Sequence, residues 1–254
     1  MGAIVLLCSD NPASRIIFHA LQDRFGQVSV IQEEPVPQTV LLRRRAARLG
    51  PVKVAGQVLF RAAVVPWLTL RGRDRVAEIK RQLQLDDRPM VEVEHVSSMN
   101  DTGARERLAS IHPVITVVCG TRILSRETLA ALNGPVVNFH AGITPLYRGV
   151  HGGYWALVDG HRDLVGSTIH RIDPGIDTGE VIAQATFDVT PADSFVTYPY
   201  LHVAAALGPL ADVVRRALDG DDLVSQPHRS DLDSRLRTHP TLFEYLRSAR
   251  RGVR

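Results

Sequence analysis

Short apolar runs alternate with amphipathic segments over the first part of the chain. The apolar runs predict buried strands near residues 3–8, 27–32, 90–95, 114–119 and 135–139. Between them, apolar positions at helical spacing predict helices near 13–24, 101–110 and 125–132. Strands that alternate with helices build a parallel sheet with both faces covered. The pattern therefore predicts an α/β fold with a doubly wound, mostly parallel, Rossmann-like sheet.

The second half of the chain continues this pattern with longer elements. A short helix is expected at 152–158, and two strands at 165–172 and 181–189 are joined by a loop that contains Asp177. A long helix from about 193 to 218 follows, with Asp193 or Ser194 as its N-cap, because an oxygen-bearing side chain there satisfies free backbone N–H groups. Residues 1–190 are thus expected to form the main domain, and 191–254 a helical extension packed on it.

A basic segment interrupts the alternation and is expected to be an insertion at about 38–85. Between residues 43 and 81 there are eleven Lys or Arg residues, against only Asp74 and Glu78. The apolar stretch within it is broken by Arg61 and Pro66 and is shorter than the ~20 residues that span a bilayer. We expect an amphipathic helical element that lies over a substrate cleft, in the subunit interface of a homodimer, or on an anionic membrane surface.

Basic residues also gather near the C-terminal end, where residues 229–254 include seven arginines. Because Lys and Arg neutralise phosphates, nucleic-acid binding is one interpretation. The other is a solvated helix with a frayed basic end. The net charge of only +3 and the lack of a recognised nucleic-acid motif favour this second interpretation, so no nucleic-acid partner is expected.

Composition narrows the class of protein. With 254 residues and 44% hydrophobic residues, the chain can bury a sizeable core. Cys8 and Cys119 lie in apolar runs and are predicted to be small buried hydrophobes. The ten histidines form no metal-binding spacing, so no metal is predicted. The apolar start is too short for a secretory segment, and no transmembrane segment is expected, which makes a cytoplasmic location the default.

Three polar side chains are expected where ligands bind in such folds. Val136-Val137-Asn138-Phe139-His140 is typical of a buried strand that ends on polar groups, and Asp177 lies in a later loop. An amide, an imidazole and a carboxylate can stabilise and move protons around a tetrahedral carbon. Taken singly, Asn138 could form a turn, His140 could be a structural hydrogen-bonding residue, and Asp177 could form an Asx-turn. The catalytic hypothesis therefore depends on the three together.

The same residues carry a resemblance to a known family. Residues 138–149 and the run Asp173-Pro174-Gly175-Ile176-Asp177-Thr178-Gly179-Glu180-Val181-Ile182 resemble the motifs of the folate-dependent formyltransferases. That family includes glycinamide ribonucleotide, methionyl-tRNA and nucleotide-sugar N-formyltransferases, and the match covers roughly residues 110–190. The resemblance implies a formyltransferase fold, N10-formyltetrahydrofolate as co-substrate and a primary amine as acceptor. It implies that Asn138, His140 and Asp177 are the catalytic residues.

The resemblance also implies where the two substrates bind. Segment 120–124 looks like the family's folate-pocket segment, and loop 172–179 would close over the pterin ring. The implied folate-binding residues are Gly120, Thr121, Arg122, Ile123, Leu124, Ile172, Gly175 and Gly179. The candidates for contact with the acceptor are Asn11, Tyr147, Arg148, Gly149 and His151. For Arg148 a solvated charge, and for His151 a role in loop packing, are the alternatives, while Tyr154 and Trp155 are expected in the core.

The acceptor is inferred from the positions at which this chain differs from particular members of the family. The turn at residues 9–14 has no glycine, an acidic Asp10 and a Pro12 without an N–H, unlike the phosphate-binding loop of glycinamide ribonucleotide formyltransferases. Asn11 is expected to cap the next helix or to bind a sugar. The tail is unlike the domain by which methionyl-tRNA formyltransferases grip tRNA. With a length close to that of bacterial nucleotide-sugar N-formyltransferases, the predicted acceptor is an amino sugar on a nucleotide carrier. Alternatives are glycinamide ribonucleotide or another small-molecule amine, hydrolysis of formyltetrahydrofolate, and a non-catalytic folate-binding protein.

Overall fold

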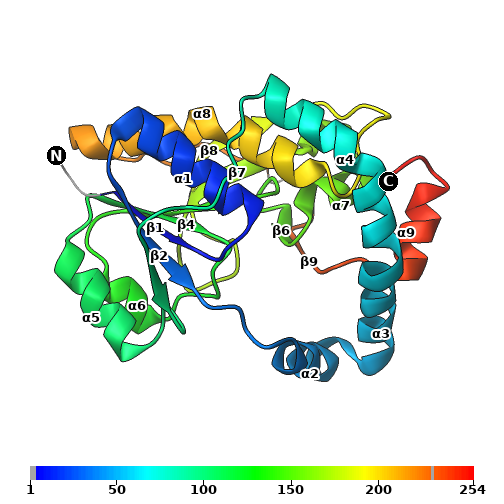
Figure 1. Ribbon diagram of the computed structural model, residues 1–254, viewed down its shortest axis with the longest axis horizontal. Helices are drawn as coiled ribbons and strands as arrows, with labels where there is room; N and C mark the ends of the chain where they lie inside the picture. Colours follow the sequence, from blue (N-terminus) through cyan, green and yellow to red (C-terminus); the bar gives the residue numbers. More distant parts are fainter. Residues whose placement is uncertain (1–3, 230–231) are drawn as a thin grey trace.

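A seven-stranded sheet forms the centre of the computed structural model, which describes residues 4–229 and 232–254 (Figure 1). Its strands are β1 (Ile4–Cys8), β2 (Val28–Glu33), β3 (Val93–Val96), β4 (Ile115–Cys119), β5 (Val136–His140), β7 (Gly166–Arg171) and β8 (Val181–Thr186). The strand order is β3-β2-β1-β4-β5-β7-β8. The first five strands are parallel to one another, and β7 alone runs in the opposite direction, antiparallel to both β5 and β8. The predicted doubly wound, mostly parallel sheet is confirmed.

Helices cover both faces of this sheet (Figure 1). They are α1 (Pro12–Phe25) and α8 (Tyr198–Asp219) on one face, and α5 (Thr102–Ile111) and α6 (Arg126–Ala131) on the other. Because successive side chains of a strand point to opposite faces, Leu6 enters the core beneath α1 and α8, and Leu7 enters the core beneath α5 and α6. Burial of β1 on both faces explains its unbroken apolar run.

The basic segment forms the predicted helical insertion. Its elements are α2 (Gln38–Leu49), α3 (Pro51–Leu59), a π-helical turn η1 (Phe60–Val64) and α4 (Val65–Gln82). Phe60 and Leu68 are buried in a second core together with side chains of α7 (Gly152–Asp159). No residue of α2 is buried. The insertion is therefore anchored through its second half, and α2 spans from the loop after β2 to α3 (Figure 1).

The long helix begins later than predicted. α8 starts at Tyr198 with Thr197 as its N-cap, and no side chain caps it. Asp193 instead accepts hydrogen bonds from the Arg75 guanidinium of α4 at 2.9 Å and from the Thr190 N–H at 2.8 Å. The predicted N-cap at Asp193 or Ser194 is wrong, because this carboxylate fixes the preceding loop to the insertion. The division between residues 1–190 and 191–254 stays a prediction, although α8 shares its core with the sheet.

The C-terminal residues form more structure than a solvated helix. Strand β9 (Arg235–Arg237) pairs in parallel with β6 (Tyr147–Gly149) as a separate two-stranded sheet. The final helix, α9 (Leu242–Ala249), begins with a capping box formed by Thr241 and Glu244. Tyr245 and Ser248, about one turn apart, are both buried. The predicted solvated helix is therefore wrong for this face of α9.

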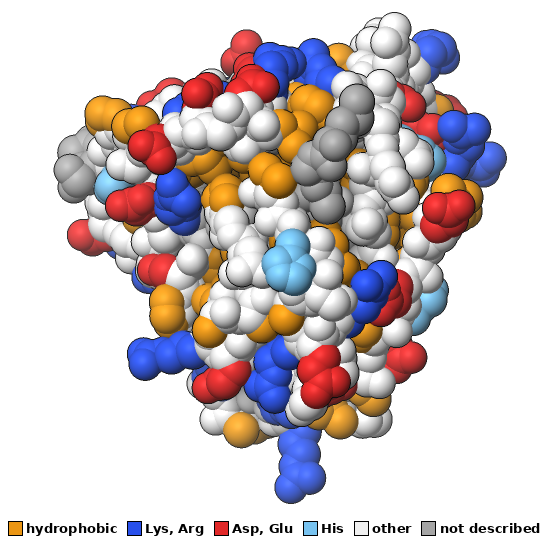
Figure 2. Space-filling view, turned by 90° about the vertical axis from the view of Figure 1, so that its left-hand side faces the viewer, with side chains coloured by type: hydrophobic (Ala, Val, Ile, Leu, Met, Phe, Trp, Pro, Cys, Tyr) orange, Lys and Arg blue, Asp and Glu red, His pale blue; other side chains and the backbone are white. Residues whose placement is uncertain are grey.

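Charge is distributed unevenly over the surface. On the face opposite the insertion, acidic and basic side chains are intermingled (Figure 2). Helix α2, by contrast, contains four arginines and no acidic residue. Among the described residues, no helix combines the length and the apolar character that crossing a bilayer requires.

The two cysteines behave as predicted. Cys8 of β1 and Cys119 of β4 are neighbours in register, and both are buried free thiols. Burial raises the pKa of Cys8 to about 12 and that of Cys119 to about 11. Both side chains therefore remain protonated and act as core hydrophobes.

Candidate active site

A pocket of about 970 Å³ opens where four parallel strands end. Ser9, Glu33, Cys119 and His140, which come from the ends of β1, β2, β4 and β5, all line it. Open α/β sheets bind their ligands at this edge. The pocket extends to the insertion and to the C-terminal segment, so it is lined by parts of the chain that are distant in sequence.

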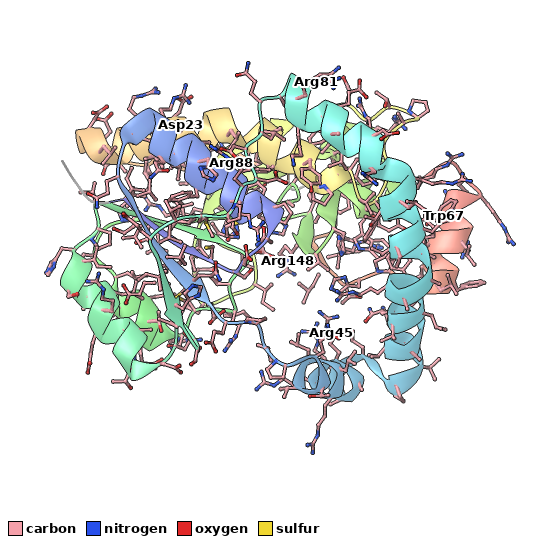
Figure 3. The ribbon with its side chains drawn as sticks, in the orientation of Figure 1. Asp23, Arg45, Trp67, Arg81, Arg88 and Arg148 are labelled. Carbon is pink, nitrogen blue, oxygen red and sulfur yellow. The ribbon has the colours of Figure 1, made fainter. Side chains whose placement is uncertain are left out.

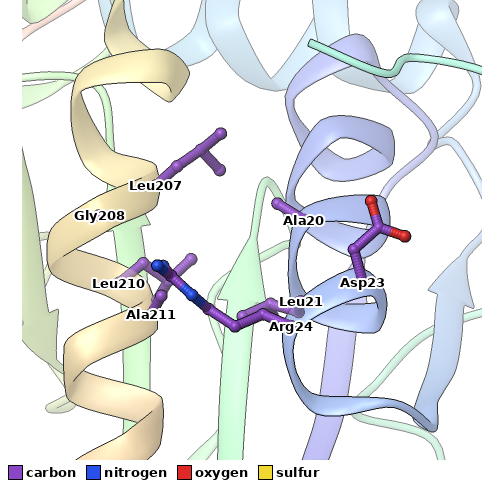
Figure 4. Close-up of a pocket in the computed structure, with 8 residues that line it drawn as sticks. All are labelled: Ala20, Leu21, Asp23, Arg24, Leu207, Gly208, Leu210 and Ala211. Atoms are coloured by element: carbon purple, nitrogen blue, oxygen red, sulfur yellow. The ribbon is translucent and has the colours of Figure 1, made fainter. Parts of the chain in front are cut away.

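A second hollow, of about 500 Å³, lies between α1 and α8 (Figure 4). Its walls are mostly aliphatic, and the Arg24 side chain extends across it from α1 toward α8 (Figure 4). It contains none of the candidate catalytic residues. The pocket at the strand ends is therefore the candidate site.

His140 and Asp177 lie side by side in that pocket. Nδ1 of His140 is 3.4 Å from Oδ1 of Asp177. On its other side, Nε2 of His140 lies 2.8 Å from the carbonyl oxygen of Tyr147. Because a carbonyl oxygen only accepts, Nε2 carries the proton in this hydrogen bond. Both ring nitrogens of His140 thus face oxygen atoms.

The Asp177 carboxylate is held in place from several sides. Its backbone adopts a left-handed conformation, with φ of 52°, in the loop between β7 and β8. Its Oδ2 accepts a 2.8 Å hydrogen bond from the Gly149 N–H. Burial opposes ionisation, but hydrogen bonds from His140 and from the Gly149 N–H outweigh it, so the pKa of Asp177 falls well below its ordinary value. The carboxylate is therefore ionised at neutral pH and fixed in position.

A second histidine at this carboxylate was missed by the sequence analysis. Nε2 of His170 is 3.6 Å from Oδ1 of Asp177 and 3.0 Å from Nδ2 of Asn138. Nδ1 of His170 donates to the carbonyl of Arg171 at 2.7 Å, so Nε2 can accept from the Asn138 amide. The antiparallel register of β5 and β7 places Asn138 opposite His170. The sequence signal was His170 itself, near the end of the predicted strand at 165–172.

The five residues of segment 120–124 all line the pocket. Gly120 has φ of 72°, and a Cβ there would lie 3.0 Å from Oγ of Ser9. The N–H of Arg122 donates to Glu33 at 2.9 Å, and its guanidinium donates to the Glu34 carbonyl at 2.6 Å. The backbone of this segment is therefore fixed against the end of β2, and the charge of Arg122 is engaged by the protein.

Of the other three residues predicted to bind folate, two line the pocket and one does not. Ile172 and Gly175 line the pocket, whereas Gly179 does not. A Cβ on Gly179 would lie 1.8 Å from the carbonyl oxygen of Arg171. Gly179 therefore serves the close approach of two backbone segments beside the pocket.

Three of the five residues predicted to contact the acceptor line the pocket. Asn11, Gly149 and His151 line the pocket, and Tyr147 and Arg148 do not. Tyr147 is 3% exposed in the second core. Arg148 is not the solvated charge considered above, because its guanidinium donates to Oγ of Ser234 at 2.9 Å and to the Ile176 carbonyl at 3.3 Å. Through its contact with Ile176, Arg148 supports the loop that contains Asp177, and it does so from outside the pocket.

Two local interpretations are confirmed. Asn11 is the N-cap of α1, since its Oδ1 accepts the Ser14 N–H at 3.0 Å. Tyr154 and Trp155 are both buried in the second core. Arg45, Arg61 and His239 also line the pocket, and no sequence pattern indicated that the C-terminal histidine would reach it.

The chain belongs to the formyl transferase family, whose model matches residues 69–200, just over half of the chain. A methionyl-tRNA formyltransferase from Thermodesulfovibrio yellowstonii is 31% identical over 129 residues, which are 50% of this chain and 41% of that protein. In five such relatives the matched segments cover 26% to 44% of the relative's length. The chain therefore spans less than half the length of these curated relatives.

Solved structures share the fold at lower identity. Glycinamide ribonucleotide transformylase 1 from Symbiobacterium toebii matches with a TM-score of 0.56 and 19% identity, covering 87% of this chain and 89% of that one. An N-formyltransferase from Helicobacter canadensis, in complex with folinic acid and dTDP-3-aminofucose, matches with a TM-score of 0.54 and 13% identity, covering 92% and 70%. The predicted formyltransferase fold is confirmed.

Proposed function

We propose that the protein transfers a formyl group from N10-formyltetrahydrofolate to a primary amine on a small molecule. The observation that carries the proposal is the approach of His140 to the ionised Asp177, 3.4 Å apart, in a pocket that Asn138 also lines. Family membership supports this chemistry. The three side chains supply the donor, proton carrier and orienting carboxylate that acyl transfer to an amine requires.

The pocket suits the proposed co-substrate. Its volume of about 970 Å³ is near the top of the roughly 300–1,000 Å³ range of small-molecule sites. Apolar side chains of Leu124, Phe139 and Ile172 line it beside the fixed backbone of segment 120–124. A flat ring with polar edges can lie on such a surface and exchange hydrogen bonds with the backbone. These residues would therefore hold the pterin.

Each proposed catalytic residue has a distinct role. Bound formyltetrahydrofolate supplies an electrophilic formyl carbon, which the neutral amine attacks. Asn138 and the N–H of His140 hold the oxyanion that develops on the formyl oxygen. That N–H donates to the Tyr147 carbonyl in this structure, so oxyanion binding exchanges one acceptor for another. Asp177 orients His140 and accepts the amine proton through water. The bond between the formyl carbon and N10 then breaks, and that proton passes to N10 of the departing tetrahydrofolate, so no covalent enzyme intermediate is required.

The acceptor that we propose is an amino sugar on a nucleotide carrier. The related fold from Helicobacter canadensis has dTDP-3-aminofucose in its complex, which supports this class. Glycinamide ribonucleotide has less support, because the turn at residues 9–14 lacks glycine. We also propose that the protein has no nucleic-acid partner and that it acts in the cytoplasm.

Absorbance-monitored folate turnover with a panel of amines, and a control without amine, tests the proposal. Turnover that requires a nucleotide-linked amino sugar is expected. Turnover without amine would identify a hydrolase, and folate binding without any turnover would identify a non-catalytic folate-binding protein. Turnover with glycinamide ribonucleotide alone would correct the acceptor.

A further inference from the structure

One end of the pocket is built from three parts of the chain that are far apart in sequence. Arg45 comes from α2, Arg61 from η1, and His239 from the segment between β9 and α9. His151, at the start of α7, completes the group. In Figure 3, Arg45 rises from α2 toward the part of the molecule where Arg148 lies. We call these four residues the Arg–His cluster.

Hydrogen bonding fixes the proton positions within the cluster. The guanidinium of Arg45 lies 3.2 Å from Nε2 of His239, and Nδ1 of His239 lies 2.9 Å from Nε2 of His151. Because a guanidinium only donates, Nε2 of His239 accepts, and the proton of His239 is on Nδ1. That proton is donated to His151. Both imidazole rings are therefore neutral, and the hydrogen bonds run in one direction, from Arg45 to His239 and from His239 to His151.

The environment keeps the two rings neutral. Burial, and then repulsion from neighbouring charges, lowers the pKa of His151 to about 3 and that of His239 to about 4. A neutral imidazole can orient a guanidinium without cancelling its charge. A carboxylate in the same place would orient it equally well but would neutralise it.

The positive charge of the cluster has no acidic counterpart. In the part of the chain that the structure describes, neither Arg45 nor Arg61 forms an ion pair. Burial lowers the pKa of Arg45, and repulsion from Arg61 and Arg48 adds to this effect. The carboxylates that line the pocket are Glu33, Glu34, Asp173 and Asp177, and none of them forms an ion pair with either arginine. Glu33, the most buried of them, accepts hydrogen bonds from backbone N–H groups. Charges left unpaired at one end of a pocket attract an anion.

We propose that Arg45 and Arg61 form an oxyanion-binding subsite that holds the phosphate groups of the acceptor. The inference rests on the proposed function and names the part of the acceptor that this end of the pocket recognises. Guanidinium groups match phosphate oxygens with paired N–H donors. The turn at residues 9–14 has no glycine-rich phosphate loop, so the insertion supplies this contact instead. The same pocket contains His140 and Asp177, so one ligand can reach both regions.

Calorimetric titration of the full chain with inorganic pyrophosphate tests the subsite. The wild-type protein should bind, and high salt should weaken the binding. Arg45→Gln and Arg61→Gln should each weaken it by about tenfold or more, because each removes a charge-assisted hydrogen-bond donor. Arg43→Gln is the matched control, since Arg43 lies on the same helix but is exposed and does not line the pocket. It should bind pyrophosphate as the wild type does.

Two further arms sharpen the test. Titration with orthophosphate distinguishes a monophosphate site, which binds both anions alike, from a diphosphate site, which prefers pyrophosphate. His239→Asp should weaken pyrophosphate binding as much as Arg45→Gln, although it removes no arginine, because it places an anion beside Arg45. Thermal melts identify any variant that fails to fold. If Arg45→Gln or His239→Asp fails to fold, the affinity of Arg61→Gln for pyrophosphate decides the test.

Equal affinity of the wild type, Arg45→Gln and Arg61→Gln for pyrophosphate would overturn the proposal. So would an equal loss in Arg43→Gln, which would indicate a general charge effect. Parallel titration with 5-formyltetrahydrofolate separates the two levels of inference. Folate binding without pyrophosphate binding rejects the subsite alone, whereas absence of folate binding rejects the proposed function and leaves the pyrophosphate result to decide the subsite.

Discussion

The backbone N–H of Gly149 donates a 2.8 Å hydrogen bond to Oδ2 of Asp177. Gly149 is also the last residue of β6, which pairs with β9 near the C-terminal end of the chain. The C-terminal strand thus fixes the backbone that holds the candidate catalytic carboxylate. Residues outside the family's matched segment therefore contribute to the geometry of the site.

Replacing Gly149 with Ala should separate β6 from β9. Gly149 has φ of 91°, and a Cβ there would lie 2.2 Å from the carbonyl oxygen of Arg237. Gly160 has φ of 87° with open space around it, so Gly160→Ala reports the backbone strain alone. Gly149→Ala should lower the free energy of unfolding by about 2 kcal/mol more than Gly160→Ala, measured by urea denaturation. If both variants lost the same free energy of unfolding, the close approach of Gly149 to Arg237 would not contribute to stability.

Loss of either member of the His140 and Asp177 pair should slow the reaction. His140→Ala and Asp177→Asn should each lower kcat by about a hundredfold or more, because each group acts mainly in the transition state. Steady-state kinetics with saturating folate measures the effect. Glu180→Gln, an exposed change in the same loop, is the control and should retain activity. Wild-type turnover in either test variant would refute the assignment.

His170 should act as a positioning residue. It accepts from Asn138 at 3.0 Å and lies beside Asp177, so its loss frees the Asn138 amide to rotate. His170→Leu should lower kcat by about tenfold while the KM for formyltetrahydrofolate stays nearly unchanged. A purely structural role would instead lower the melting temperature and leave kcat of the folded fraction intact.

Reduced folates should bind the free protein. Segment 120–124 lines the pocket on a fixed backbone, so little ordering is needed on binding. A ligand at about a hundred times its Kd stabilises the folded state by about 2.7 kcal/mol. Saturating 5-formyltetrahydrofolate should therefore raise the melting temperature by several degrees. No thermal shift and no heat in calorimetry would exclude the proposed co-substrate.

Stability should fall as pH decreases below about 6.5, before the carboxylates titrate. Burial lowers the folded-state pKa of His202 to about 3, and His151 and His239 shift in the same direction. The unfolded chain binds protons near the ordinary histidine pKa of about 6.5, so stability is fully present above that pH. Below it, each such histidine removes up to about 1.4 kcal/mol per pH unit until its folded pKa is reached.

Urea denaturation over a pH series measures this loss. His202→Asn should reduce the slope of unfolding free energy against pH, whereas His228→Gln, a change at an exposed position, should not. A flat profile between about pH 7 and pH 5 would mean that the buried rings titrate normally.

Much of the fold follows from local periodicity. The apolar run of β1 and the helical spacing of α1 predicted both elements within a residue or two, because burial on a sheet or helix face imposes a fixed spacing. Asn11 was identifiable as an N-cap because its partner Ser14 is three residues away. Asp193 could not be assigned in the same way, because its partner Arg75 is 118 residues distant.

The sequence by itself determined the α/β class, the strands and helices of the main sheet, and the pairing of an Asn-x-His motif with a downstream Asp. Each of these is encoded by spacing within one segment or by a motif. Only the tertiary structure decided that His170 lies opposite Asn138, that β9 pairs with β6, and that His239 meets Arg45 across 194 residues. Periodicity specifies which face of an element is buried, but not which partner covers it. Strand register and the packing of the insertion against the C-terminal segment make that choice, and they bring the charged end of the pocket together.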